Sequence, residues 1–82
     1  MDSTSYSTAV AGNVRTTLKA AGLSVTELAA VTGISRQTLA RRLAPINPSP
    51  LTMSELKSIA DALGTTALQL ATVVIATERA VA

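Results

Sequence analysis

The sequence predicts an all-α fold, and three observations carry this prediction. Hydrophobic residues make up 48% of the 82 residues, but Tyr6 is the only aromatic one, so any core has to be aliphatic. Apolar residues recur in several stretches at spacings of three and four, the period of one helix face. Glycine or proline separates these stretches, as is typical of helix ends. We expect five helices in a single domain, because a chain this short has room for one core.

The first predicted helix covers about residues 6–21. An apolar residue stands at every fourth position from Val10 onward, which gives the helix one apolar face. Gly22 follows it, and glycine commonly ends a helix by adopting the left-handed conformation. The small and polar residues 1–8 are expected to form a flexible N-terminal segment. The remainder, residues 9–82, is expected to form the single domain.

Two short helices are predicted next. The first of them covers about residues 25–32, and Ser24 with Glu27 stands at its start. This spacing is that of a capping box, in which each side chain accepts a hydrogen bond from the other residue's backbone N–H. Gly33 ends this helix. The following helix, residues 35–43, opens on a serine that can cap it.

All three prolines lie within residues 44–51, which we expect to form a stiff, extended loop because proline fixes its own backbone angle. The fourth helix, about residues 53–63, opens on a capping box of Thr52 and Glu55. Its apolar residues follow the positions i, i+3, i+4 and i+7. A fifth helix is predicted over about residues 67–79, and Thr66 with Gln69 forms a third pair of this kind at its start.

The second and third helices have the features of a helix-turn-helix. Gly33 in the turn can adopt a positive φ that other residues resist. Ala29 is small, which allows the third helix to cross close to it, and Ile34 fills the corner. Leu28 and Leu39 are expected to bury the inner faces of the two helices. Such a pair, flanked by further helices, is a frequent DNA-binding unit.

The charge distribution agrees with this interpretation. The net charge is only +2, but residues 1–46 carry five basic and two acidic residues, whereas residues 47–82 carry two basic and three acidic ones. Three arginines lie within residues 36–42. This concentration of positive charge indicates a partner with dense negative charge.

Residues 23–43, LSVTELAAVTGISRQTLARRL, resemble the helix-turn-helix of the lambda-repressor-like, or Xre-type, DNA-binding family. Residues 51–64 resemble the fourth helix of that family, and the similarity covers about residues 10–75. It implies a five-helix lambda-repressor-like bundle that binds DNA, usually as a dimer. Two departures are the longer, proline-rich loop over residues 44–50 and Val25, where many relatives carry a glutamine that binds a phosphate.

The resemblance implies that the third helix is the recognition helix and lies in the major groove, with its N-terminal end nearest the bases. The outward side chains of this helix are the candidate base contacts: Ser35, Arg36, Gln37, Ala40 and Arg41. The candidate phosphate contacts are Lys19, Ser24, Thr26, Thr38, Arg42 and Asn47. Arg42 has a second interpretation, in which its stem covers the core.

The fifth predicted helix is apolar nearly all round between residues 67 and 76. One face is expected to cover the core, and the opposite face would be exposed in a monomer. We expect that opposite face to pack against a second copy in a two-fold dimer. Its residues are Leu68, Thr72, Ile75 and Arg79. The alternative is that the N-terminal segment covers this helix.

The composition also excludes several classes of function. The chain has no cysteine and no histidine, which excludes disulfides, a zinc site built on these ligands, and a Ser-His or Cys-His nucleophile. We therefore expect that the protein is not an enzyme and needs no metal or other cofactor, and no small-molecule ligand is evident. No stretch predicts a membrane span or an export signal, so we expect a cytoplasmic protein of a bacterial nucleoid or a phage-infected host.

These observations predict a sequence-specific transcriptional regulator of the phage-repressor or Cro-like kind, which binds a double-stranded DNA operator as a homodimer. Two alternatives stay open. One is a recombination accessory protein that uses the same DNA contacts to shape a site. The other is an antitoxin-type interaction module whose fifth helix binds a protein. DNA binding through several phosphates would weaken steeply with salt, and an apolar protein interface would not.

Overall fold

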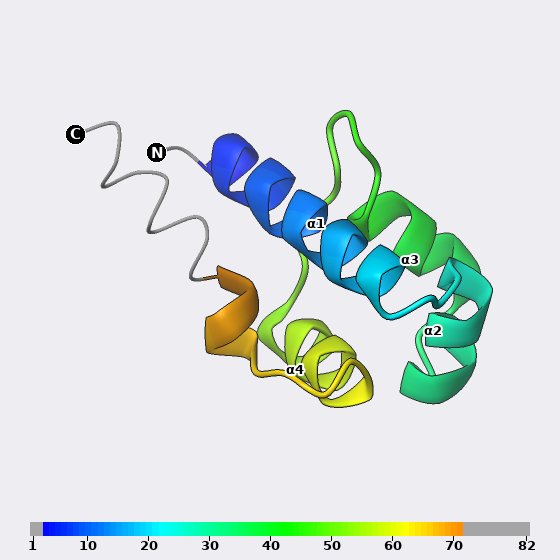
Figure 1. Cartoon of the computed structure of the whole chain (residues 1–82). Helices are drawn as coiled ribbons and strands as arrows, with labels where there is room; N and C mark the ends of the chain where they lie inside the picture. Colours follow the sequence, from blue (N-terminus) through cyan, green and yellow to red (C-terminus); the bar gives the residue numbers. More distant parts are fainter. Residues whose placement is uncertain (1–2, 72–82) are drawn as a thin grey trace.

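The structure, a computed structural model, describes residues 3–71, with side chains from Tyr6 onward. This part of the chain is all-helical, as predicted (Figure 1). The helices are α1 (Ser3–Ala20), α2 (Val25–Thr32), α3 (Arg36–Arg42) and α4 (Met53–Ala62), followed by a short helical segment at residues 67–71. None of the helices within these residues is long and apolar enough to cross a lipid bilayer.

The predicted caps explain where the helices begin. At α2 the Ser24 hydroxyl accepts the Glu27 N–H at 3.1 Å, and the Glu27 carboxylate accepts the Ser24 N–H at 3.0 Å, which completes the capping box. Thr52 and Glu55 form the same reciprocal pair at α4. Ser35 caps α3 with its hydroxyl. Each cap satisfies backbone N–H groups that a helix leaves unpaired, and each is worth about 1 kcal/mol.

Gly33 forms the turn between α2 and α3 in the conformation that the sequence predicts. Its φ is 77°, in the left-handed region, and its N–H donates to the carbonyl of Ala29 at 2.9 Å. A Cβ built on Gly33 would meet no atom within 4 Å. The glycine is therefore required by the backbone conformation and not by a lack of space.

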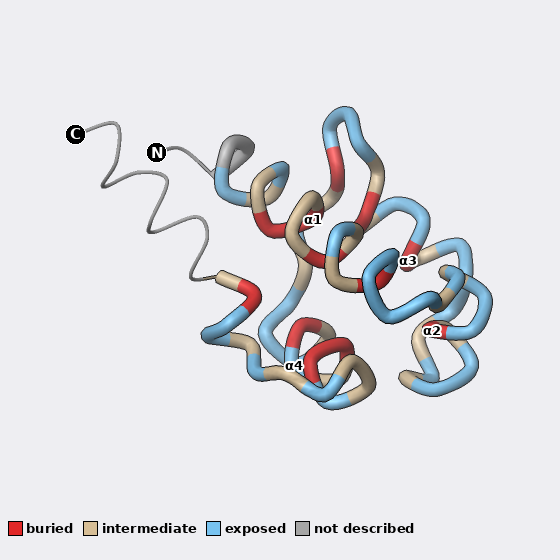
Figure 2. Tube along the Cα trace, in the orientation of Figure 1, coloured by how far each residue is buried: buried red, intermediate tan, exposed pale blue. Residues whose placement is uncertain are grey.

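The core lies where the helices meet, and it is aliphatic as predicted. Leu28 of α2, Leu39 of α3 and Ile59 of α4 are fully buried, and α1 adds Val14 to them. Figure 2 shows buried residues on α1, α3 and α4. Burial of one such side chain is worth about 1.5–3 kcal/mol. The other buried members of this core are Val10, Leu18, Leu43, Leu56, Ala60 and Leu70.

α1 begins earlier than predicted. It starts at Ser3 and so includes most of residues 1–8, the segment that the sequence predicts to be flexible. Small polar side chains favour a flexible segment, but serine and threonine are only mildly unfavourable in a helix that is packed elsewhere. Packing is available here, because Tyr6 and Val10 share a small apolar pocket with Leu51.

The later helix ends differ little from those predicted. α3 ends at Arg42, one residue before the predicted limit of the recognition helix. The fifth helix begins as predicted, because the Thr66 hydroxyl accepts the Gln69 N–H at 3.0 Å and residues 67–71 are helical. The rest of that predicted helix, residues 72–79, lies outside the described residues.

The left-handed turn gives the first testable prediction. We expect Gly33→Ala to lower the free energy of unfolding by about 1 kcal/mol or more, because an L side chain is strained at this φ. The matched control is Gly12→Ala in the interior of α1, where a Cβ would make only an ordinary contact with Arg15 at 3.6 Å. This control should raise stability by about 0.5–1 kcal/mol. Urea unfolding followed by circular dichroism measures both, and equal effects of the two substitutions would contradict the assignment.

Candidate nucleic-acid interface

The outward face of α3 gathers the predicted base contacts. Leu39 is fully buried on the inner side of this helix, whereas all five predicted base contacts are exposed, namely Ser35, Arg36, Gln37, Ala40 and Arg41. Positions 36, 37, 40 and 41 lie on one side of a helix because they repeat after four residues. Within the described residues neither Arg36 nor Arg41 forms an ion pair. Both guanidinium groups are therefore available to an anionic partner.

The start of α2 lies beside this face of α3. Val25, the first residue of α2, lines a shallow surface pocket together with Arg36, Gln37 and Ala40. An amide side chain at position 25 could donate a hydrogen bond, and the valine cannot. Any polar contact made from this edge must therefore come from a neighbouring residue, and Thr26 is exposed next to it.

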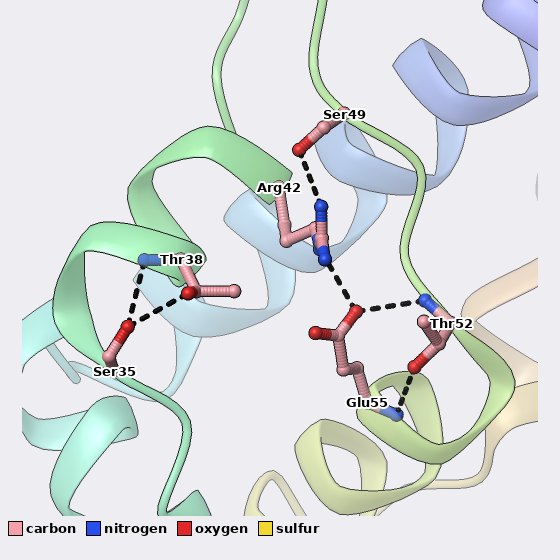
Figure 3. A network of polar contacts seen from close by, with 6 residues as sticks. All are labelled: Ser35, Thr38, Arg42, Ser49, Thr52 and Glu55. Atoms are coloured by element: carbon pink, nitrogen blue, oxygen red, sulfur yellow. Dashed lines mark hydrogen bonds and ion pairs between the residues drawn. The ribbon is translucent and has the colours of Figure 1, made fainter.

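The hydroxyl groups of Ser35 and Thr38 are partners of each other. The Ser35 hydroxyl accepts the Thr38 N–H at 3.1 Å and donates to the Thr38 hydroxyl oxygen at 2.8 Å (Figure 3). This arrangement leaves the Thr38 hydroxyl proton able to point outward, since its oxygen already accepts. Ser35 keeps one lone pair but no donor, so the cap role takes most of its hydrogen-bonding capacity.

The predicted phosphate contacts come from several elements of the structure. Lys19 and Thr26 are exposed at the ends of α1 and α2. Ser24 is exposed too, but its N–H and hydroxyl are both engaged with Glu27, whose carboxylate also brings negative charge to the start of α2. Asn47 is exposed in the loop between α3 and α4, where its φ of 49° is left-handed.

Arg42 is partly buried and is held by two partners. Its Nε lies 3.0 Å from the Glu55 carboxylate, and its Nη1 donates to the Ser49 hydroxyl at 2.8 Å (Figure 3). Only 24% of its side chain is exposed. Of the two interpretations of Arg42, these contacts support the structural one, with the refinement that the guanidinium acts as an ion-pair partner and not only through its stem.

Glu55 serves two elements at once. One carboxylate oxygen accepts both the Thr52 N–H at 2.9 Å, as part of the cap of α4, and the Arg42 Nε. Partial burial on its own raises the pKa of Glu55, but the hydrogen bonds from Thr52 and the charge of Arg42 outweigh burial. The pKa of this carboxyl therefore lies below its ordinary value of 4.5.

Arg15 is a positioning residue that the sequence does not reveal. From α1 its Nη1 donates to the Leu43 carbonyl at 2.7 Å and to the Ala44 carbonyl at 3.3 Å. These carbonyls follow the last turn of α3, where a cation is favoured by the helix dipole. The sequence shows only that Arg15 follows Val14, a residue of the apolar face of the first helix. This position does not identify the partners of Arg15.

The predicted dimer surface is only partly within the described residues. Leu68 is exposed, with 71% of its surface accessible. Thr72, Ile75 and Arg79 lie outside the described residues.

The chain is similar to a known family of DNA-binding domains. The family model described as a Cro/C1-type HTH DNA-binding domain matches residues 13–74, a range that includes α2, α3 and α4. No curated protein and no solved structure gives a significant match.

The double role of Glu55 gives a prediction about pH. Because its pKa is lowered in the folded protein, its stabilising contribution is fully present above the pKa of an unfolded glutamate and is lost as the pH falls through the folded value. We expect Glu55→Gln, which can still cap α4, to lower stability by about 1 kcal/mol near neutral pH, because a hydrogen-bonded ion pair is lost.

Unfolding experiments across the acid range measure this difference. The matched control is Glu27→Gln, the same change at the same capping position of α2, because Glu27 has no arginine partner within the described residues. The gap between wild type and Glu55→Gln should close in acid. A gap that stays constant at all pH values would show that the ion pair with Arg42 adds nothing.

Proposed function

Because the chain belongs to the family of Cro/C1-type helix-turn-helix DNA-binding domains, we propose that it is a sequence-specific transcriptional regulator that recognises duplex DNA with α3 in the major groove. The observation that carries this proposal is the exposed face of α3. Its two arginines, Arg36 and Arg41, have no ion-pair partner among the described residues, while the opposite side of the helix is anchored in the core.

The side chains of this face have the chemistry that base recognition requires. An arginine can donate two hydrogen bonds to the O6 and N7 of guanine, and a glutamine can form a similar pair with adenine. We assign Arg36 and Arg41 to guanines and Gln37 to an adenine. Ala40 lies between them and leaves room for close approach or touches a thymine methyl. Each bidentate pair discriminates by about 1–3 kcal/mol against a wrong base.

Phosphate contacts would fix the register of α3 without recognising sequence. We assign them to Lys19, Thr26 and the outward proton of the Thr38 hydroxyl, all three on helices that border α3 or belong to it. We do not assign one to Arg42, because its side chain is partly buried and is bound to Glu55 and Ser49.

The proposed regulator binds as a homodimer and acts by occupying an operator, in the manner of a phage repressor or Cro-like protein. Exposed Leu68, at the start of the last described helical segment, supports a protein contact there. Two recognition helices in a two-fold dimer would meet half-sites about 34 Å apart, one turn of DNA.

Enrichment of binding sites from randomised duplex DNA by the purified protein tests this function. We expect a two-fold symmetric motif whose half-sites are one helical turn apart. A single asymmetric half-site bound at a ratio of one to one would reject the dimer. No enrichment at low salt would reject DNA recognition itself and would favour an interaction module.

Substitution of a base contact gives a further prediction. Arg36→Ala should weaken binding to the enriched site by about 1–3 kcal/mol and relax the preference at one base position. The control is Lys57→Ala, which removes one positive charge from α4, where Lys57 pairs with Asp61; it should leave the base preference unchanged. Equal losses by Arg36→Ala on specific and random DNA would make Arg36 a phosphate contact.

The salt dependence of binding separates Lys19 from Arg42. Lys19→Ala should reduce the slope of log affinity against log salt by about 1, because one phosphate contact is lost. Arg42→Met should leave this slope unchanged and lower the free energy of unfolding, since it breaks the contacts with Glu55 and Ser49. Titrations at three salt concentrations, together with urea unfolding, measure both effects. A reduced slope for Arg42→Met would show instead that Arg42 contacts a phosphate.

A further inference from the structure

The loop between α3 and α4 projects from the body of the protein and presents an apolar side chain at its tip. Figure 1 shows this loop rising from the end of α3 before the chain returns to α4. Ile46 is 79% exposed, which is more than any other large hydrophobic residue in the described chain. Asn47 stands next to it and is also exposed.

The two arms of the loop are anchored. The buried residues Leu43 and Pro48 hold either side of the tip, as Figure 2 shows by the buried segments that flank its exposed end. The Ser49 N–H donates to the Arg41 carbonyl at 3.0 Å, which closes the loop onto the last turn of α3. The base of the loop is therefore fixed to the recognition helix.

Arginines reinforce the anchoring from both sides. Arg15 holds the carbonyls of Leu43 and Ala44 on the outgoing arm, and Arg42 holds the hydroxyl of Ser49 on the returning arm. At the tip itself the backbone of Asn47 is left-handed, and the prolines on either side restrict their own backbone angles. These contacts hold the loop in the conformation in which Ile46 is exposed.

The position of the loop relative to α3 indicates what Ile46 meets. α3 has seven residues and so spans about 10 Å, which is close to the 12 Å or so of the major groove. With α3 in the major groove as proposed, this length lets its C-terminal end reach one backbone wall of the groove, and the minor groove begins beyond that wall. The loop leaves α3 directly after Arg42 and returns to the Arg41 carbonyl through Ser49, so its tip projects from the C-terminal end of α3.

The chemistry of the tip fits the minor groove better than the phosphates. Residues 43–54 contain no charged residue, so the loop has neither a cation for a phosphate nor a carboxylate that DNA would repel. Proteins that bind the minor groove insert isoleucine and similar apolar side chains between base steps, and use asparagine on the base edges. The Ile46–Asn47 pair provides both.

We propose that Ile46 enters the minor groove beside the half-site that α3 recognises, and that Asn47 donates to base acceptors there. This inference rests on the proposed function, because it requires α3 in the adjacent major groove. It replaces the phosphate contact that the sequence predicts for Asn47. It also adds an activity to recognition, since an apolar wedge partly unstacks the bases and bends the duplex by about 20–90°.

The test compares two duplexes that share the enriched motif, one ending at its edge and one extended by about half a helical turn on each side. Wild type should bind the extended duplex about tenfold more tightly, because Ile46 is then buried, and should bend it, as measured by energy transfer between dyes at its ends. Ile46→Ser should lose the gain and the bend. The matched control Met53→Ser removes a side chain that is 76% exposed on α4 and should lose neither.

Salt distinguishes the apolar contact from added phosphate contacts. The part of the gain that depends on Ile46 should persist as salt is raised, whereas a phosphate contact would weaken. Ile46→Ala serves as a second variant if the serine variant does not fold. Should the Ile46 variants match wild type on both duplexes, the inference is overturned and recognition by α3 stands.

Two further outcomes separate the inference from the proposed function. A wild-type protein that binds neither duplex would overturn the function and the inference together. Ile46 variants that change the sedimentation of the free protein, and not the bend, would assign Ile46 to a contact between protein chains and would overturn the minor-groove contact alone.

Discussion

A helix of seven residues has little stability of its own in water, so α3 keeps its place only through contacts with the rest of the chain. Leu39 supplies the main contact, because its complete burial turns one side of α3 into the core. Burial of this side determines which side faces outward. The orientation of the exposed arginines therefore follows from the packing of a single leucine against α2 and its neighbours.

Packing alone would leave the two ends of α3 free to fray, and polar contacts hold them. Ser35 caps the first turn, and Arg15 binds the carbonyls beyond the last one. Arg42 then ties the last turn to α4 through Glu55. Within the described residues, side chains of α1 and α4 thus help to hold the exposed face of α3 in place.

The sequence predicts those parts of this arrangement that depend on local chemistry. Ser24, Gly33 and Thr52 act within one turn of their own positions, so their roles follow from spacing alone. The partners of Arg15 and Arg42 lie 28 and 13 residues away, and no periodic pattern contains such pairings. The early start of α1 escapes prediction for the same reason, since it depends on packing against the loop before α4.

The exposed side chains of α3 and the side chains that hold the helix in place are different residues, and this has an evolutionary consequence. The side chains of Arg36 and Arg41 form no ion pair among the described residues, and both are exposed, as is that of Gln37. Under the proposed function, these side chains could be exchanged for others that recognise a different DNA sequence without loss of the fold. Glu55 is in the opposite situation, because one oxygen serves both a helix start and Arg42. Loss of Glu55 leaves Arg42 without its ion-pair partner, so we expect substitutions at positions 42 and 55 to be coupled.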